Sequence, residues 1–182
     1  MRARLPIAIM MAGVLSSACW CTIGSATTTT QLELRGDGLS FALLGANESR
    51  AQAAIVQRLG SPTRALSTTP DLKNCGVAAM ATWHNLSAYF DHDRLVGLSV
   101  GPGGTPSVRT SKGLRLGQSI RIARTLYGSA LRVSNNQGGA WFVSTSEGRL
   151  DGFLVPSNGR PDSASRIFTI DVGDVGCPAM SP

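Results

Sequence analysis

The sequence predicts an α+β fold in which two tandem α-β-β-β units pack their helices on an antiparallel sheet. Three observations lead to this prediction. Two capped amphipathic segments begin about 75 residues apart, strand-like runs follow each of them, and a Gly/Pro-rich stretch separates the two sets. We therefore predict a first unit over residues 36–100, a Gly/Pro linker over 101–111, and a second unit with a C-terminal tail over 112–182.

Both predicted helices carry their own start and stop signals. In the first, over residues 47–60, Asn47 can cap the first turn and Gly60 supplies the stop. Apolar residues recur at four-residue intervals and define one buried face. Residues 120–127 repeat this plan on a shorter scale and end at Gly128. The recurrence of cap, helix and glycine is the main sign of an internal repeat.

Strand-like runs follow each helix. In chain order they are 77–83, 86–90 and 95–100 in the first unit, and 140–144, 150–155 and 167–172 in the second. The run at 86–90 alternates apolar and polar residues, and the turn formers Asp91-His92-Asp93 are predicted to turn a hairpin after it. Trp83 and Trp141 fall in corresponding first strands, and we predict that both lie in the core.

The N-terminus has the features of an export signal. A short basic start precedes an uncharged apolar run at residues 5–18, which is too short to cross a bilayer as a helix. Small residues precede two candidate cleavage sites, after Ala18 and after Ala26, and the second is preferred. We therefore predict a signal peptide at 1–26, a flexible lead at 27–35, and a secreted or otherwise extracytoplasmic location.

The four cysteines divide between the signal and the exported chain. Leu15-Ser16-Ser17-Ala18-Cys19 resembles a bacterial lipoprotein box, so lipidation at Cys19 is an alternative to cleavage after Ala26 and would be the link to a membrane. Cys75 and Cys177 lie beyond the signal. Two cysteines in an oxidising compartment most often form one disulfide, and closing this long loop is worth about 4–5 kcal/mol in the chain-entropy model.

Charge points to one candidate surface. The chain has a formal net charge of +6, but an aromatic content of 5% offers few platforms for stacking bases, so we predict no nucleic-acid partner. Six cations crowd the start of the second unit: Arg109, Lys112, Arg115, Arg121, Arg124 and Arg132. They are candidates for a patch that meets another protein or an anionic envelope surface. The alternative is a solvated helix face.

The sequence predicts no catalytic, cofactor-binding or metal-binding residue. The two histidines, His84 and His92, fall in or beside turns, and Asp91-His92-Asp93 is better explained as a solvated turn than as a metal site. Phosphate-loop, dinucleotide and zinc-protease motifs are absent from the sequence. Arg35-Gly36-Asp37 spells an adhesion tripeptide, which we attribute to chance.

One ordered set of motifs carries a resemblance. The set is Gly38-Leu39, Leu59-Gly60-x-Pro62, Cys75, Trp83, Leu86-x-x-x-Phe90-Asp91-x-x-x-Leu95, Gly97-Leu98, Gly113-Leu114-x-x-Gly117 and Leu126-Tyr127-Gly128. It resembles a group of uncharacterised exported proteins of high-GC bacteria, from about Gly36 to Cys177. The tandem plan is similar to that of β-lactamase inhibitory protein, and one unit is similar to the small lipoprotein of the outer-membrane barrel-assembly machinery.

The last two of these, the inhibitory protein and the barrel-assembly lipoprotein, bind proteins and catalyse nothing. The resemblance therefore implies a non-enzymatic protein- or envelope-binding module. The alternatives are a structural cell-envelope lipoprotein and a hydrolase with dispersed catalytic residues.

Overall fold

A large antiparallel sheet forms the centre of the computed structural model, which describes residues 31–104, 106–134, 139–155 and 161–175. Its strands run in the order β4-β5-β6-β7-β13-β11-β10-β9, and β12 pairs with β11. The strand bounds are β4 Arg64–Ser67, β5 Ala79–Trp83, β6 Leu86–Asp91, β7 Arg94–Val100, β9 Leu131–Ser134, β10 Ala140–Thr145, β11 Gly148–Val155, β12 Arg166–Ile167 and β13 Ile170–Gly173. The predicted signal peptide, Cys19 and Cys177 lie outside the described residues.

A smaller sheet has the order β3-β2-β1-β8. Its strands are β1 Gln31–Arg35, β2 Gly38–Leu39, β3 Ala42–Leu43 and β8 Ser107–Thr110. The structure corrects two predictions here. β1 lies in the predicted flexible lead and β8 lies in the predicted linker, and the two strands pair with each other in parallel. Leu32, Leu34 and Val108 are buried, and this burial of alternate side chains stabilises both strands.

The two predicted helices are found within one residue of their expected bounds. α1 spans Glu48–Leu59 and α3 spans Ile120–Tyr127, followed by the 3-10 turn η1, Gly128–Ala130; a short α2 spans Pro70–Asn74. The Asn47 side chain accepts hydrogen bonds from the backbone N–H groups of Ser49 and Arg50, which confirms the predicted cap. No helix among the described residues is long and apolar enough to cross a membrane.

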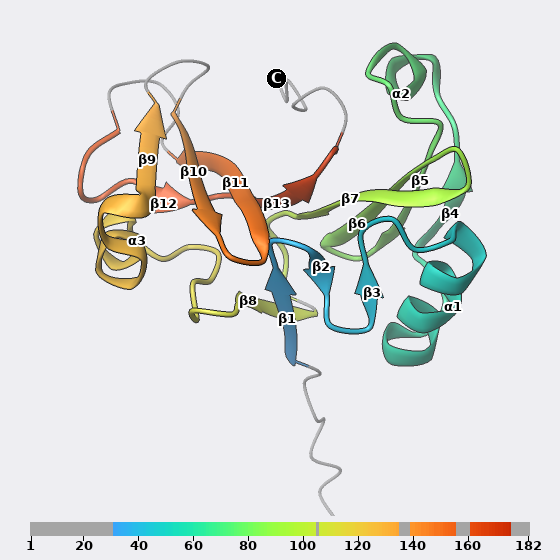
Figure 1. The fold of residues 1–182 in the computed structure, drawn as a ribbon, viewed down its shortest axis with the longest axis horizontal. Helices are drawn as coiled ribbons and strands as arrows, with labels where there is room; N and C mark the ends of the chain where they lie inside the picture. The colour runs from blue at the N-terminus through green and yellow to red at the C-terminus, as the bar shows by residue number, and fades with distance from the viewer. Residues whose placement is uncertain (1–30, 105, 135–138, 156–160, 176–182) are drawn as a thin grey trace, which may run out of the picture.

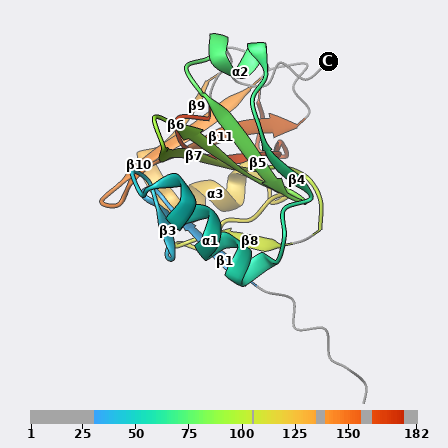
Figure 2. The same cartoon turned by 90° about the vertical axis from the view of Figure 1, so that its right-hand side faces the viewer.

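The core lies between the large sheet, α1, α3 and the small sheet. Figure 1 shows α1, α3 and the small sheet below the large sheet and α2 above it, and Figure 2 shows the same layers from the side. Trp83 and Trp141 are 1% and 0% exposed, as predicted. Their indole N–H groups donate to the carbonyls of Gly60 and Thr169 at 3.0 and 3.3 Å. Each tryptophan thus fills the core and satisfies its polar atom.

The last predicted strand, 167–172, is interrupted. The backbone N–H groups of Phe168 and Thr169 both point to the carbonyl of Phe153, at 2.8 and 3.4 Å, which separates β12 from β13. Gly152 permits this approach because a Cβ there would lie 2.1 Å from the Thr169 carbonyl oxygen. The structure also adds β4 and β9, which the sequence did not predict, at the two edges of the large sheet. Helices packed on a mainly antiparallel sheet agree with the predicted α+β class.

Candidate functional site

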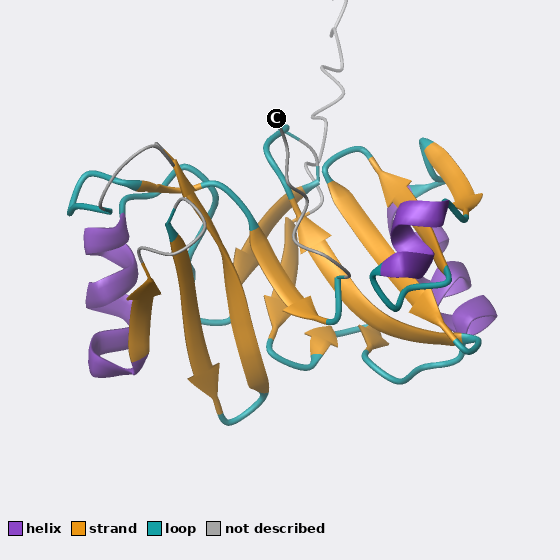
Figure 3. Ribbon diagram, turned by 90° about the horizontal axis from the view of Figure 1, so that it is seen from above, coloured by secondary structure: helices purple, strands orange, loops and turns teal. Residues whose placement is uncertain are grey.

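The two faces of the large sheet differ in chemistry. Side chains that alternate toward α1 and α3 are apolar and buried. Figure 3 shows the large sheet from above, from the side opposite α1 and α3, which we call the outer face. Most side chains on this face are partly exposed, and many are polar or aromatic. The outer face comprises Met80, Thr82, Ser87, Tyr89, Ser99, Asp171, Asp151, Phe153 and Phe142.

One row of the outer face crosses eight strands. Successive register pairs join, from edge to edge, Arg64, Thr82, Ser87, Ser99, Asp171, Asp151, Phe142 and Arg132. Side chains directly opposite each other on antiparallel strands lie within contact distance. The row therefore gathers residues from both halves of the chain, with an arginine at each end and two aspartates near its middle.

Asp171 is the most buried polar residue of this row. It is 5% exposed, and its carboxylate accepts hydrogen bonds from the hydroxyls of Ser99 at 2.5 Å and Thr169 at 3.0 Å. Burial raises the pKa of Asp171 to about 6, the two hydrogen bonds act in the opposite direction, and the negative charge of Asp151 adds to the rise. Among the described residues Asp171 forms no ion pair with a cation.

Asp151 faces Asp171 from the neighbouring strand. Its carboxylate is 3.0 Å from the guanidinium Nε of Arg149. Burial still raises the pKa of Asp151, against the effect of Arg149. Arg149 also lies 4.7 Å from the ring centre of Phe142. These residues, with Phe153 and Asp171, line a hollow in the outer face, so the middle of the row is both acidic and aromatic.

The six predicted patch cations do not form one surface. The backbones of Arg109 and Arg115 pair in a bridge, and the Lys112 ammonium lies 5.3 Å from the ring centre of Tyr127. Arg121 and Arg124 are exposed on α3. Arg132 instead lies at the end of the outer-face row, since it pairs with Phe142. The predicted patch is thus divided between the α3 side and the outer face, and within the described chain none of its members forms an ion pair.

The remaining predicted residues lie in turns. His84 and His92 have positive φ angles of 53° and 45°, and Asp91 contacts His92 in the β6–β7 turn, as predicted for this hairpin. Over the residues that the structure describes, no three His, Cys, Asp or Glu side chains gather as metal ligands would. Cys75 is the C-terminal cap residue of α2. Its predicted partner Cys177 is not among the described residues, so the disulfide stays a prediction.

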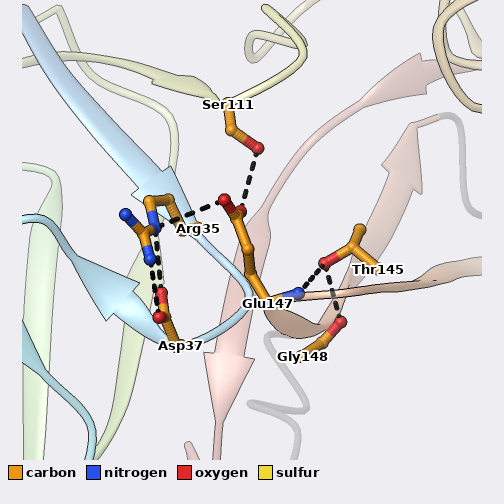
Figure 4. Close-up of polar contacts among 6 residues, drawn as sticks. All are labelled: Arg35, Asp37, Ser111, Thr145, Glu147 and Gly148. Carbon is orange, nitrogen blue, oxygen red and sulfur yellow. Dashed lines mark hydrogen bonds and ion pairs between the residues drawn. The ribbon is translucent and has the colours of Figure 1, made fainter.

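The adhesion-like tripeptide belongs to a polar cluster that joins distant turns (Figure 4). Arg35 donates to both carboxylate oxygens of Asp37, at 3.1 and 2.7 Å. Its Nε also lies 3.6 Å from Glu147 in the β10–β11 turn, and Ser111 donates to the same carboxylate at 3.2 Å. The charged groups of the tripeptide therefore form contacts within the fold. Arg35 binds Asp37 and also contacts Glu147, which links the β1–β2 turn to the second half of the chain.

Sequence reasoning did not single out Ser99, Asp151 or Asp171 as site residues. The available signal was an aspartate at a polar position of each of two strands, Gly148–Val155 and Ile170–Gly173. Alternation predicts that such residues leave the core face, but not that they lie opposite each other. Their juxtaposition follows from the pairing of β11 with β13.

No protein-family model matches the chain, and no curated protein matches it. Among solved structures, the crystal structure of the uncharacterized protein yfeY from Escherichia coli has a TM-score of 0.48 and 8% sequence identity, and the match covers 78% of this chain and 99% of that one.

Proposed function

We propose that this chain is a non-enzymatic, extracytoplasmic binding protein and that the outer face is its protein-binding surface. The observation that carries the proposal is the eight-residue row, which runs between the two edges of the sheet. α1 and α3 pack on the other side of the sheet (Figure 1). This leaves the row on the side that the two long helices do not cover.

The chemistry of the outer face suits a protein partner. Tyr89, Phe142 and Phe153 are partly exposed there, and aromatic residues are enriched in the energetically dominant parts of protein interfaces. Hydroxyls and charged groups between them supply the polar contacts that fix a partner's orientation. The proposal includes export of the protein and a disulfide between Cys75 and Cys177. Lipidation at Cys19 is the alternative to cleavage after Ala26.

We also propose that the face is built from two tandem units. Counted inward from the edges, β4, β5, β6 and β7 correspond to β9, β10, β11 and β13, and the two sets meet at the β7–β13 pair. α1 precedes the first set in the chain and α3 the second. The units in this proposal are α-β-β-β-β, with one more strand each than the sequence predicts.

Affinity capture with two charge variants tests the outer face. Ser87→Arg places a guanidinium within the row, opposite Ser99, whereas Val56→Arg places the same group on α1, where Val56 is 39% exposed. From cells that export the protein, the wild type and Val56→Arg should retain the same partner, and Ser87→Arg should lose it. Equal loss with both variants, at equal thermal stability, would contradict the proposal.

The acid pair supports a second candidate function, a hydrolase. A carboxyl group with a pKa near 6 can act as a general acid close to neutral pH, and Asp151 stands opposite Asp171. Asp171→Asn distinguishes the two functions. A binding module keeps its partner when the amide replaces the carboxyl, because Asp171 is only 5% exposed and the partner meets the more exposed residues of the row. A hydrolase loses turnover of its substrate.

A further inference from the structure

A second groove lies at the start of α3, away from the outer face. The loop before α3 and the segment that leads into β12 form its two walls. The backbone joins these walls: Gly117 N–H donates to the Ile167 carbonyl at 2.8 Å, Ile167 N–H to the Gln118 carbonyl at 2.9 Å, and Ile120 N–H to the Ser165 carbonyl at 2.8 Å. The shape of the groove is therefore set by main-chain hydrogen bonds.

The groove is lined by hydrogen-bond donors of positive charge. Arg121 and Arg166 reach it from opposite walls, and Ser119 and Ser163 contribute hydroxyls. Arg166 Nη1 donates to the Gly117 carbonyl at 2.8 Å. This bond positions the guanidinium, and a guanidinium carries four further N–H groups. Ser119 caps α3 without a side-chain hydrogen bond, so its hydroxyl is available to a ligand.

Negative charge is scarce around this groove. No Asp or Glu lies among its lining residues, and the sequence contains none between Asp93 and Glu147. The nearest carboxylate along the chain, Asp162, accepts hydrogen bonds from the N–H groups of Ser165 and Ala164 at 2.8 and 2.9 Å. These bonds lower the pKa of Asp162, so this carboxylate stays charged, and they commit its Oδ1 atom to the turn.

We propose that this groove binds a phosphate group between the guanidinium groups of Arg121 and Arg166. A guanidinium presents paired donors that match two phosphate oxygens, and a tetrahedral anion is best held by donors from more than one side. The hydroxyls of Ser119 and Ser163 supply additional donors. The phosphate can be free or can belong to a lipid headgroup. This site is separate from the outer face, and its existence does not depend on the function proposed for that face.

Titration of the full-length protein with inorganic phosphate, at constant ionic strength, tests the site. Arg121→Gln removes a lining guanidinium, and Arg124→Gln removes one from the same helix outside the groove. We expect Arg121→Gln to raise the Kd for phosphate at least about tenfold, and Arg124→Gln to change it less than about twofold. The absence of saturable binding, or equal losses in both variants, would overturn the proposal.

Vesicles identify the source of the phosphate. The same proteins are mixed with phosphatidylcholine vesicles with or without phosphatidic acid, whose phosphate is a monoester. A lipid source predicts binding that requires phosphatidic acid and that Arg121→Gln weakens more than Arg124→Gln. Saturable, Arg121-dependent binding of inorganic phosphate without such vesicle binding assigns the site to a soluble phosphate.

Discussion

Ser99 donates a hydrogen bond to Asp171 across the β7–β13 pair, where the two halves of the large sheet meet. The two residues are 72 positions apart in the chain. A carboxylate that is 5% exposed and held by hydroxyls, with no cation paired to it in the described chain, is costly to ionise. The stability of the fold should therefore depend on the protonation of Asp171.

We predict that the protein gains stability as the pH falls from about 7 to about 4. The pKa of Asp171 is raised to about 6 in the folded state. At a pH between the unfolded-state and folded-state pKa values, the folded protein therefore holds a proton that the unfolded protein has released, so a fall in pH favours folding. A shift of this size corresponds to about 2–3 kcal/mol. Urea unfolding at pH 4.5 and pH 7 measures the difference, and Asp171→Asn should reduce it. Asp93→Asn, in an exposed turn of positive φ, should leave it unchanged.

We predict that Ser99→Ala destabilises the protein by about 1–3 kcal/mol at pH 7. The change removes one of the two hydroxyl donors to a buried carboxylate. The loss should be smaller at pH 4.5, where the carboxyl is protonated, and much smaller in an Asp171→Asn background. A double-mutant cycle measures this coupling. Additive effects of the two changes would show that the hydrogen bond contributes little.

We predict that Gly36→Ala destabilises the fold by about 2–4 kcal/mol. A Cβ at Gly36 would lie 2.5 Å from the Gly148 carbonyl carbon, so the β1–β2 and β10–β11 turns would have to separate and disturb the Arg35–Glu147 contact. Gly104→Ala is the matched control, because a Cβ there meets no atom within 4 Å. Equal unfolding free energies for the two variants would contradict this account of the turn contact.

We predict that Cys75 and Cys177 are joined in the exported protein. Intact mass spectrometry of the non-reduced protein should show a mass that rises by about two hydrogens on reduction. The same spectrum distinguishes a chain that begins after Ala26 from one that is acylated at Cys19. Two free thiols in the non-reduced mature protein would contradict the disulfide.

Local sequence signals predicted the elements that depend on local interactions. The Asn47 cap, the Gly60 stop and the turn at Asp91-His92-Asp93 act within a few residues, and each was found where expected. β2 and β3 have two residues each, too few for a periodic pattern. They form because pairing and burial in the small sheet stabilise them, which no local signal reveals.

The outer-face row could not be predicted for the same physical reason. Arg64, Ser99 and Asp171 lie in three distant parts of the chain, and their alignment requires the order and register of eight strands. A register shift of one residue would move each side chain of a strand to the other face. Sequence alternation predicts that such a face exists but leaves its composition open. Proximity in the sequence also grouped Arg132 with the cations near α3, from which its pairing with Phe142 on the outer face separates it.

Photo-crosslinking from the outer face tests the central claim most directly. Benzoylphenylalanine replaces Phe142, at the rim of the acidic hollow, or Val56 on α1, and the full-length protein is irradiated in the cells that export it. We expect Phe142 to yield a discrete adduct with another protein, which Ser87→Arg abolishes, and Val56 to yield none. No adduct from Phe142, or the same adduct from both positions, would contradict a binding function for the outer face.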